Sequence, residues 1–256
     1  MAKLEHKDLL DAGVHFGHLT RKWNPKMAPY IFMEKNGIHI LDLYKTLQNL
    51  ENAKSSIRSI AKSGRKIMFV ATKKQAKIVV EQEAGRLKMP FVTERWLGGM
   101  LTNFVTIRKS LKKMTSIDKL TKEESYLALA KRERLMISRE RKKLETLLGG
   151  IADLTRLPAA LFVIDVKREH IAVKEAQKLN IPVYALVDTN SDPTTVDFPI
   201  PGNDDAFNSI EVIVKQISEA IEEGLNERKK EKDEQKLQEE EQKKREVDEK
   251  EAVAEK

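Results

Sequence analysis

The sequence predicts an α/β fold: a three-layer domain with a mostly parallel sheet, into which a helical hairpin arm is inserted. Short apolar runs at 67–71, 160–165 and 182–187 are of the kind that is buried on both faces of a parallel sheet, and helical segments alternate with them. Between the first and second of these runs, Gly98 to Gly150 is bounded by two glycine pairs and otherwise contains no Gly and no Pro. A stretch this long without such residues is typical of helix.

The N-terminal segment is expected to begin with a short helix that ends at Gly13, followed by a loop punctuated by glycine. His15 and His18 lie in that loop and are possible metal ligands. No third His, Cys or carboxylate lies at ligand spacing nearby, so structural or RNA-facing roles are favoured for both. Further on, Asn36-Gly37 between two β-rich runs predicts a hairpin of 30–33 with 38–41.

The remaining core alternates between the two kinds of element. Amphipathic helices are expected at 42–63, 75–87, 169–179 and 206–225, and strands at 67–71, 89–93, 160–165 and 182–187. Repeated strand–helix–strand units with right-handed crossovers give a mostly parallel sheet that is covered on both sides. Segment 188–205, rich in Asp, Asn, Ser, Thr and Pro, is interpreted as a loop that contains the short run 196–200.

The arm is expected to consist of two helices. Apolar residues spaced three and four apart predict the first, and Thr121 to Glu124 resembles a capping box that would start the second. The first stripe is Phe104, Ile107, Leu111 and Met114, and the second is Tyr126, Ala130, Ile137, Leu144 and Leu147. The predicted organisation is therefore a discontinuous core (1–100 and 149–225), a coiled-coil hairpin arm (101–148) and a charged tail (226–256).

Positive charge concentrates on the arm. From Val105 to Leu148 there are thirteen Lys plus Arg and six Asp plus Glu, an excess equal to the net charge of +7 of the whole chain. A helical surface that needs only to be solvated usually mixes signs evenly, so phosphate contact is favoured over that alternative. The tail carries ten basic and twelve acidic residues with almost no core-forming side chain. It is predicted to be disordered, or a lone solvated helix.

Composition limits the class of protein. Lys and Arg outnumber Asp and Glu by 47 to 40, which favours an anionic partner. The absence of Cys excludes disulfides, thiolate metal sites and Cys nucleophiles, and it fits a reducing cytoplasm. No apolar run approaches the ~20 residues that cross a bilayer, and the N-terminus shows no hydrophobic signal region. We therefore expect a soluble, cytoplasmic protein.

Folds of this type often bind nucleotides at the carboxyl ends of the strands, so an enzyme is the first alternative. The sequence has no G-x-G-x-x-G, no G-x-x-x-x-G-K-[ST], and no assembled Ser-His-acid or H-E-x-x-H arrangement. Several aspartates near strand ends fit a metal or catalytic site, but they fit helix caps and turns equally. No catalytic residue, metal or cofactor is predicted, and an ion at these residues is left open: Asp165, Asp188, Asp192, Asp204 and Asp205.

The candidate RNA-binding residues are cations and their neighbours on four surfaces. In the first basic loop Trp23 lies between cations, where it either stacks on a base or is tucked under the domain edge. The residues are Arg21, Lys22, Trp23, Asn24 and Lys26 in that loop; Lys73 and Lys74 after the first core strand; Arg95, Thr102 and Asn103 at the start of the arm; and Arg108, Lys109, Lys112, Lys113, Arg139 and Lys142 on the arm.

Three stretches resemble one family. LLDAGVHFGH at 9–18, followed by WNPKM at 23–27, closely resembles the N-terminal signature of the bacterial ribosomal small-subunit protein two family (the universal "S-two" family). PAALFVID at 158–165, with Glu175 and NIP at 180–182, resembles its second signature. RWLGGMLTNF at 95–104 resembles the entry into its arm. The resemblance covers about residues 1–225 and does not extend to the tail.

The resemblance implies a Rossmann-like (flavodoxin-like) core with a protruding coiled coil, bound to 16S ribosomal RNA (rRNA) on the back of the small subunit. It further implies neighbouring ribosomal proteins as partners, and a role in recruiting the large RNA-binding ribosomal protein "S-one". Two other classes are a basic nucleotide-dependent enzyme and an RNA-binding scaffold outside the ribosome. Co-sedimentation with 30S particles separates these three classes.

Overall fold

The computed structural model describes residues 4–123, 126 and 128–254, with side chains up to residue 234. Its centre is a five-stranded sheet in the order β5-β4-β6-β7-β8, in which every neighbouring pair is parallel. The strands are β4 (Ile67–Val70), β5 (Phe91–Val92), β6 (Ala160–Ile164), β7 (Val183–Val187) and β8 (Phe198–Pro201). The expected α/β fold with a parallel sheet is confirmed.

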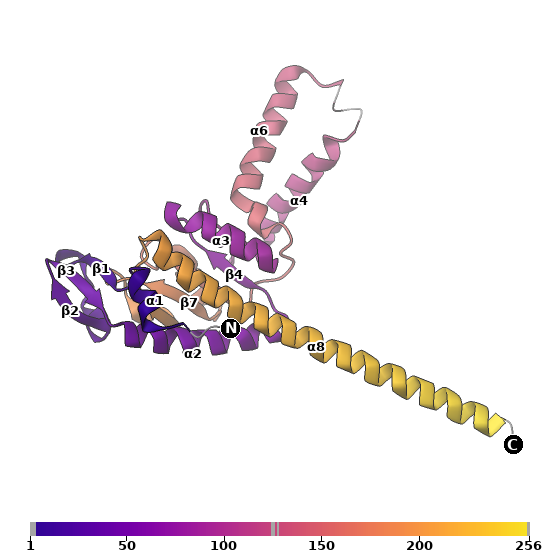
Figure 1. Cartoon of the computed structure of the whole chain (residues 1–256). Coiled ribbons are helices and arrows are strands. Elements are labelled where there is room, and N and C mark those ends of the chain that lie inside the picture. The colour runs from indigo at the N-terminus through magenta and orange to yellow at the C-terminus, as the bar shows by residue number, and fades with distance from the viewer. Residues whose placement is uncertain (1–3, 124–125, 127, 255–256) are drawn as a thin grey trace.

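Alternate residues of the central strands enter two separate cores, because successive side chains of a strand point to opposite faces. Phe69 and Phe162 pack edge to face in the first core, where the helices are α1 (His6–Asp11), α2 (Leu43–Lys62), α3 (Lys74–Leu87) and α8 (Phe207–Ala254). Met68 and Val163 enter the second core with α7 (His170–Lys178) and the base of the arm. The sheet is thus the middle of three layers (Figure 1).

A second sheet, antiparallel and of three strands in the order β1-β3-β2, lies at one end of the body, on the left in Figure 1. The hairpin of β2 (Ile31–Lys35) and β3 (Ile38–Leu41) is as expected, and Asn36 and Gly37 both have positive φ at its turn. β1 (Phe16–Leu19) was expected to be loop, and that prediction is wrong. It forms because it pairs with the free edge of β3, a contact that no local pattern encodes.

The loop expected over 188–205 also contains structure. β8 pairs with β7, so the short run at its centre is an edge strand of the main sheet. Pro199 and Pro201 are tolerated there because an edge strand needs donors on one side only. A 3₁₀ turn, η4 (Pro193–Thr195), precedes β8, and the Asp192 side chain caps it by accepting a hydrogen bond from the backbone N–H of Thr194.

The arm is a helical hairpin that protrudes from the body (Figure 1). Its helices are α4 (Phe104–Leu120) and α6 (Lys131–Leu148). The second helix begins later than expected: Thr121 is the C-cap of α4, Tyr126 and Ala130 precede α6, and Glu124 of the expected capping box lies outside the described residues. The apolar base of the arm, Ile107, Leu111 and Leu148, belongs to the second core. Coiled-coil winding of the two helices stays a prediction.

Glycines shape both ends of the arm. Gly99 has a φ of +87°, a conformation that side chains rarely adopt. At the other end Gly150, in η3 (Gly149–Ile151), lies so close to β5 that an added Cβ would stand 2.3 Å from the carbonyl oxygen of Phe91. A larger residue would therefore strain the backbone where the arm leaves the body, at Gly99, and displace the backbone where it re-enters, at Gly150.

The last helix continues past the boundary that was expected at residue 226. α8 runs to Ala254 and extends far beyond the body (Figure 1). Of the two alternatives for the tail, disorder or a lone solvated helix, the structure has the helix. Its first turns beyond 225 lie along α2: Arg58 and Lys62 form ion pairs with Glu227, and Lys62 forms another with Glu231.

Candidate nucleic-acid interface

The first basic loop consists of two 3₁₀ turns, η1 (Thr20–Lys22) and η2 (Pro25–Tyr30). Arg21 and Lys22 are exposed, and no ion pair reaches either of them among the described residues. Trp23 is 38% exposed and its ring lies 5.1 Å from that of His39, tilted by 48°. Part of the indole thus rests on the small sheet while the rest is open to solvent, an arrangement suited to stacking.

Two residues of that loop have structural partners. The Asn24 side chain accepts a hydrogen bond from the N–H of Lys26 and caps η2, and its own N–H donates to the carbonyl of Thr189 (2.8 Å). Lys26 Nζ contacts Asp192 Oδ2 at 2.6 Å. Burial alone would raise the pKa of Asp192, but the hydrogen bond from Lys26 lowers it. This side of the loop is therefore pinned to the β7–β8 connection.

The start of the arm is fixed by one carboxylate. Glu175 of α7 is 8% exposed and accepts five hydrogen bonds, from groups that all lie between residues 96 and 102. The donors are the Trp96 indole N–H (3.1 Å), the backbone N–H groups of Gly99 (2.7 Å), Leu101 (2.9 Å) and Thr102 (3.0 Å), and the Thr102 hydroxyl (3.1 Å). Burial would raise the pKa of Glu175, but these hydrogen bonds lower it below its ordinary value.

The three residues predicted to bind RNA at the start of the arm, Arg95, Thr102 and Asn103, have different surroundings. Thr102 holds the segment in place through Glu175, and Asn103 accepts a hydrogen bond from the Thr106 hydroxyl in the first turn of α4. Arg95 is exposed and, within the described residues, has no ion-pair partner. Trp96 is 6% exposed, so it is a packed residue, in contrast to Trp23.

The arm exposes cations without partners. Arg108, Lys109 and Lys112 are exposed on one stripe of α4, and no ion pair reaches them in the part of the chain that the structure describes. Arg139 and Lys142 of α6 are also exposed, and no ion pair reaches them among the described residues. Lys113 differs, because it pairs with Glu140 across the hairpin.

Lys73 corrects one prediction. It lies where β4 ends, between β4 and β6, the point at which the strand order reverses and nucleotides bind in related folds. Its side chain is buried and contacts Asp165 (3.0 Å), Asp204 (2.7 Å) and Asp205 (2.7 Å). Burial would lower the pKa of Lys73, but these carboxylates raise it. The Lys73 side chain is therefore buried and its charge is paired in the free protein, whereas its neighbour Lys74 is exposed.

In the loop that follows β4, a protein carboxylate already accepts a backbone N–H group of the kind that binds phosphate in nucleotide-binding folds. The backbone N–H of Thr72, directly after β4, donates to the buried carboxylate of Glu169 (3.0 Å), and Arg168 donates to the Thr72 hydroxyl (2.7 Å). Burial raises the pKa of Glu169 above its ordinary value. A carboxylate thus occupies the position at which a nucleotide-binding loop would receive an anion.

His18 is the residue that sequence reasoning placed least well. Its missing partners come from a distant part of the chain: Nδ1 contacts Asp188 Oδ2 at 2.9 Å, and Nε2 lies 3.3 Å from Asp205 Oδ2. The carboxyl ends of parallel strands meet at one edge, which is the only signal that could have grouped the aspartates. The local sequence named His18 as a possible ligand but offered no partner for it.

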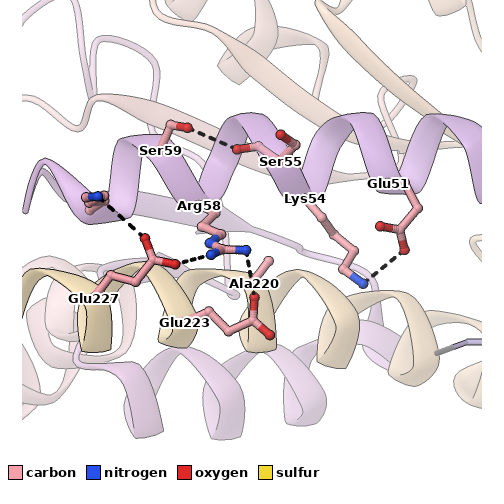
Figure 2. A pocket seen from close by; sticks show the side chains of 9 residues that line it. Glu51, Lys54, Ser55, Arg58, Ser59, Ala220, Glu223 and Glu227 are labelled. Carbon is pink, nitrogen blue, oxygen red and sulfur yellow. Dashed lines mark hydrogen bonds and ion pairs between the residues drawn. The ribbon is translucent and has the colours of Figure 1, made fainter. Parts of the chain in front are cut away.

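A groove lies between α2 and α8, away from the strand ends (Figure 2). Ion pairs cross or line it, including Arg58 with Glu223 and Lys54 with Glu51. Opposite charges are already paired along its length, so the groove is a polar seam between two helices and offers neither a nucleotide site nor a cationic surface.

Comparison with known proteins gives one consistent result. The family model described as "Ribosomal protein S2" matches residues 9–224. Three similar proteins are each named small ribosomal subunit protein uS2. That of Cytophaga hutchinsonii is 69% identical over 91% of this chain and 91% of its own length, that of Phocaeicola vulgatus 63% over 91% and 83%, and that of Flavobacterium johnsoniae 62% over 90% and 91%. Among the described residues, no helix is both long and apolar enough to span a membrane.

Proposed function

The chain belongs to the ribosomal protein S2 family, and we propose that it acts in the small ribosomal subunit by binding 16S rRNA through its first basic loop, the start of the arm and the cationic stripes of the arm. As a member of this family it is a structural ribosomal protein of translation and not an enzyme.

The observation that carries the proposal is the unpaired charge on the arm. Arg108, Lys109 and Lys112 share one face of α4, and Arg139 and Lys142 are exposed on α6. α4 has 17 residues and is about 25 Å long at 1.5 Å per residue, and Arg108, Lys109 and Lys112 lie within about 6 Å along it. Helical RNA is recognised mainly by its shape and its phosphates, and a cluster of unpaired cations suits that mode.

Neutralising one stripe tests the proposal. In a variant with Arg108→Gln, Lys109→Gln and Lys112→Gln, the log–log salt dependence of binding to 16S rRNA should become shallower by about 2–3, one phosphate contact per cation. Gln is nearly as good a helix former as Lys and Arg, so α4 should persist.

The matched control removes three charges from the tail, by Lys229→Gln, Lys230→Gln and Lys232→Gln. These residues are exposed on α8, and this variant should bind rRNA and co-sediment with 30S particles as the parent does. Equal weakening in both variants would mean that net charge, and not the arm, governs binding. An unchanged salt slope in the arm variant would refute phosphate contact by α4.

Recruitment of the ribosomal protein "S-one" is the second part of the proposal, and it rests on the resemblance to the S-two family. Small subunits reconstituted without this chain should retain less "S-one" after sedimentation, and adding the chain back should restore it. Retention of the same amount without the chain would refute this part while leaving rRNA binding intact.

A further inference from the structure

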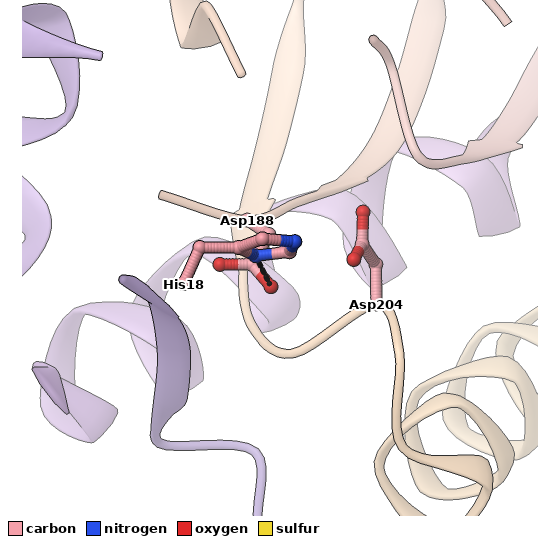
Figure 3. A group of neighbouring side chains, drawn as sticks. All are labelled: His18, Asp188 and Asp204. Carbon is pink, nitrogen blue, oxygen red and sulfur yellow. Dashed lines mark ion pairs between the residues drawn. The ribbon is translucent and has the colours of Figure 1, made fainter. Parts of the chain in front are cut away.

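Three side chains from distant segments converge at the carboxyl edge of the main sheet. His18 lies in β1, Asp188 follows β7 and Asp204 follows β8, and Figure 3 shows them pointing toward one another. One potential ligand atom from each lies within 4.8 Å of the other two. Two ligands of one zinc ion, each at about 2.0–2.2 Å from it, lie up to ~4 Å apart, so shifts of about 1 Å would close the group on an ion.

An orphaned oxygen within the group points independently to a missing ligand. Asp204 is fully buried, and its Oδ1 contacts Lys73 Nζ at 2.7 Å. No donor reaches its Oδ2 among the described residues. A buried carboxylate oxygen without a hydrogen bond is destabilising, and coordination of a cation would supply the partner it lacks.

Charge around the group is also unbalanced. Four carboxylates lie in the group or beside it, from Asp165, Asp188, Asp204 and Asp205, and within the described part of the chain Lys73 is the only permanent cation in contact with them. Lys22 acts on Asp205 from a greater distance.

We propose that His18, Asp188 and Asp204 form a binding site for one Zn²⁺ ion. The donor set favours zinc over Mg²⁺ and Ca²⁺, because those two ions prefer oxygen ligands alone, whereas an imidazole with two carboxylates suits zinc. The surrounding residues orient the ligands, as outer partners do in metal sites. The Thr189 hydroxyl donates to Asp188 Oδ1 (3.0 Å), and Asp205 and Asn190 (3.1 Å) lie at His18 Nε2.

The ion would join the small sheet to the main one. β1 contacts the body near this site through the His18 N–H, which donates to the Thr189 hydroxyl (2.8 Å). η1, with Arg21 and Lys22, follows His18 directly. Zinc would therefore fix the strand from which the first basic loop departs. The site itself does not depend on the proposed rRNA binding and is tested on the free protein.

Zinc titration of the full chain, after removal of metal with a chelator, tests the site. We expect one saturable Zn²⁺ site per chain, a rise in melting temperature on its occupation, and an X-ray absorption spectrum of one imidazole with oxygen ligands. Asp204→Asn and His18→Gln should each weaken zinc binding by about 100-fold or more, since each removes a ligand. The matched controls Asp153→Asn and His170→Gln, both exposed and outside the group, should bind as the parent does.

Circular dichroism of the metal-free variants measures whether each is folded. If Asp204→Asn unfolds, the affinity of folded His18→Gln for zinc still decides the test. The proposal is overturned by the absence of a saturable site, by unchanged affinity in folded His18→Gln, or by an absorption spectrum without imidazole. Binding of Mg²⁺ as tight as that of Zn²⁺ would overturn the assignment of the metal.

Discussion

Replacing Glu175 by Gln tests whether one carboxylate holds the arm on the body. Its Oε1 accepts from the Trp96 indole and the Gly99 N–H, and its Oε2 accepts from Leu101 and from both donors of Thr102. An amide keeps one acceptor oxygen and turns the other position into a donor. Whichever way the amide is oriented, at least two N–H groups then face an NH₂ group.

The magnitude follows from the contacts. A hydrogen bond to a charged group contributes about 1.5–3 kcal/mol, and a donor left buried without an acceptor adds a desolvation cost. Loss of two such bonds predicts that Glu175→Gln lowers the free energy of unfolding by about 3–6 kcal/mol. For a domain of this size the melting temperature should fall by about 6–24 °C.

Urea unfolding followed by circular dichroism measures the effect, with Glu211→Gln as the control. Glu211 forms a surface ion pair with Lys215 one turn away on α8, and its loss should cost less than about 0.5 kcal/mol. A free energy of unfolding for Glu175→Gln within about 1 kcal/mol of the parent would refute the reasoning, because the five contacts would then contribute almost nothing.

The pH dependence gives a second check on the same carboxylate. The pKa of Glu175 is lowered in the folded state, so its ionisation stabilises the fold fully above the ordinary glutamate pKa of 4.5. That stabilisation is lost as the pH falls through the lower folded pKa. The stability difference between parent and Glu175→Gln should therefore be constant near neutral pH and shrink below 4.5. A difference that grows on acidification would contradict the assignment.

Two further predictions concern RNA recognition and the arm. Trp23→Ala should weaken rRNA binding by roughly 1–3 kcal/mol with little change in melting temperature, whereas Trp96→Ala should destabilise the fold by roughly 3–5 kcal/mol; equal losses of stability would make Trp23 a core residue. Replacing 115–141 by a Gly-Ser linker keeps the arm's apolar base in the second core, so a cooperative thermal transition should remain while co-sedimentation with 30S particles falls. Loss of that transition would show that the outer arm is needed for folding.

Local patterns in the sequence were sufficient for most elements. The apolar runs of β4, β6 and β7, the periodicity of α2 and α8, and the Asn36-Gly37 turn each depend on residues within a few positions of one another. For Trp23 the sequence left two alternatives open, stacking on a base or packing under the domain edge, and the structure leaves its ring 38% exposed. The sequence alone therefore determined the fold class, the insertion of the arm and its excess of positive charge.

Other features were decided only when the strands were brought together. β1 exists because it pairs with β3, and β8 because it pairs with β7. Lys73 is buried and neutralised by Asp165 and Asp204, although its sequence neighbours suggest an exposed cation. Each of these outcomes depends on partners far along the chain, and no window of local sequence contains both members of the pair.

The zinc-site candidate shows the same limit. His18 and Asp188 are 170 positions apart, and they meet because a parallel sheet gathers the carboxyl ends of its strands at one edge while β1 is held beside that edge. Side-chain chemistry could be read residue by residue from the sequence. Proximity could not, because it is a property of the strand order and register, which only the complete set of long-range contacts fixes.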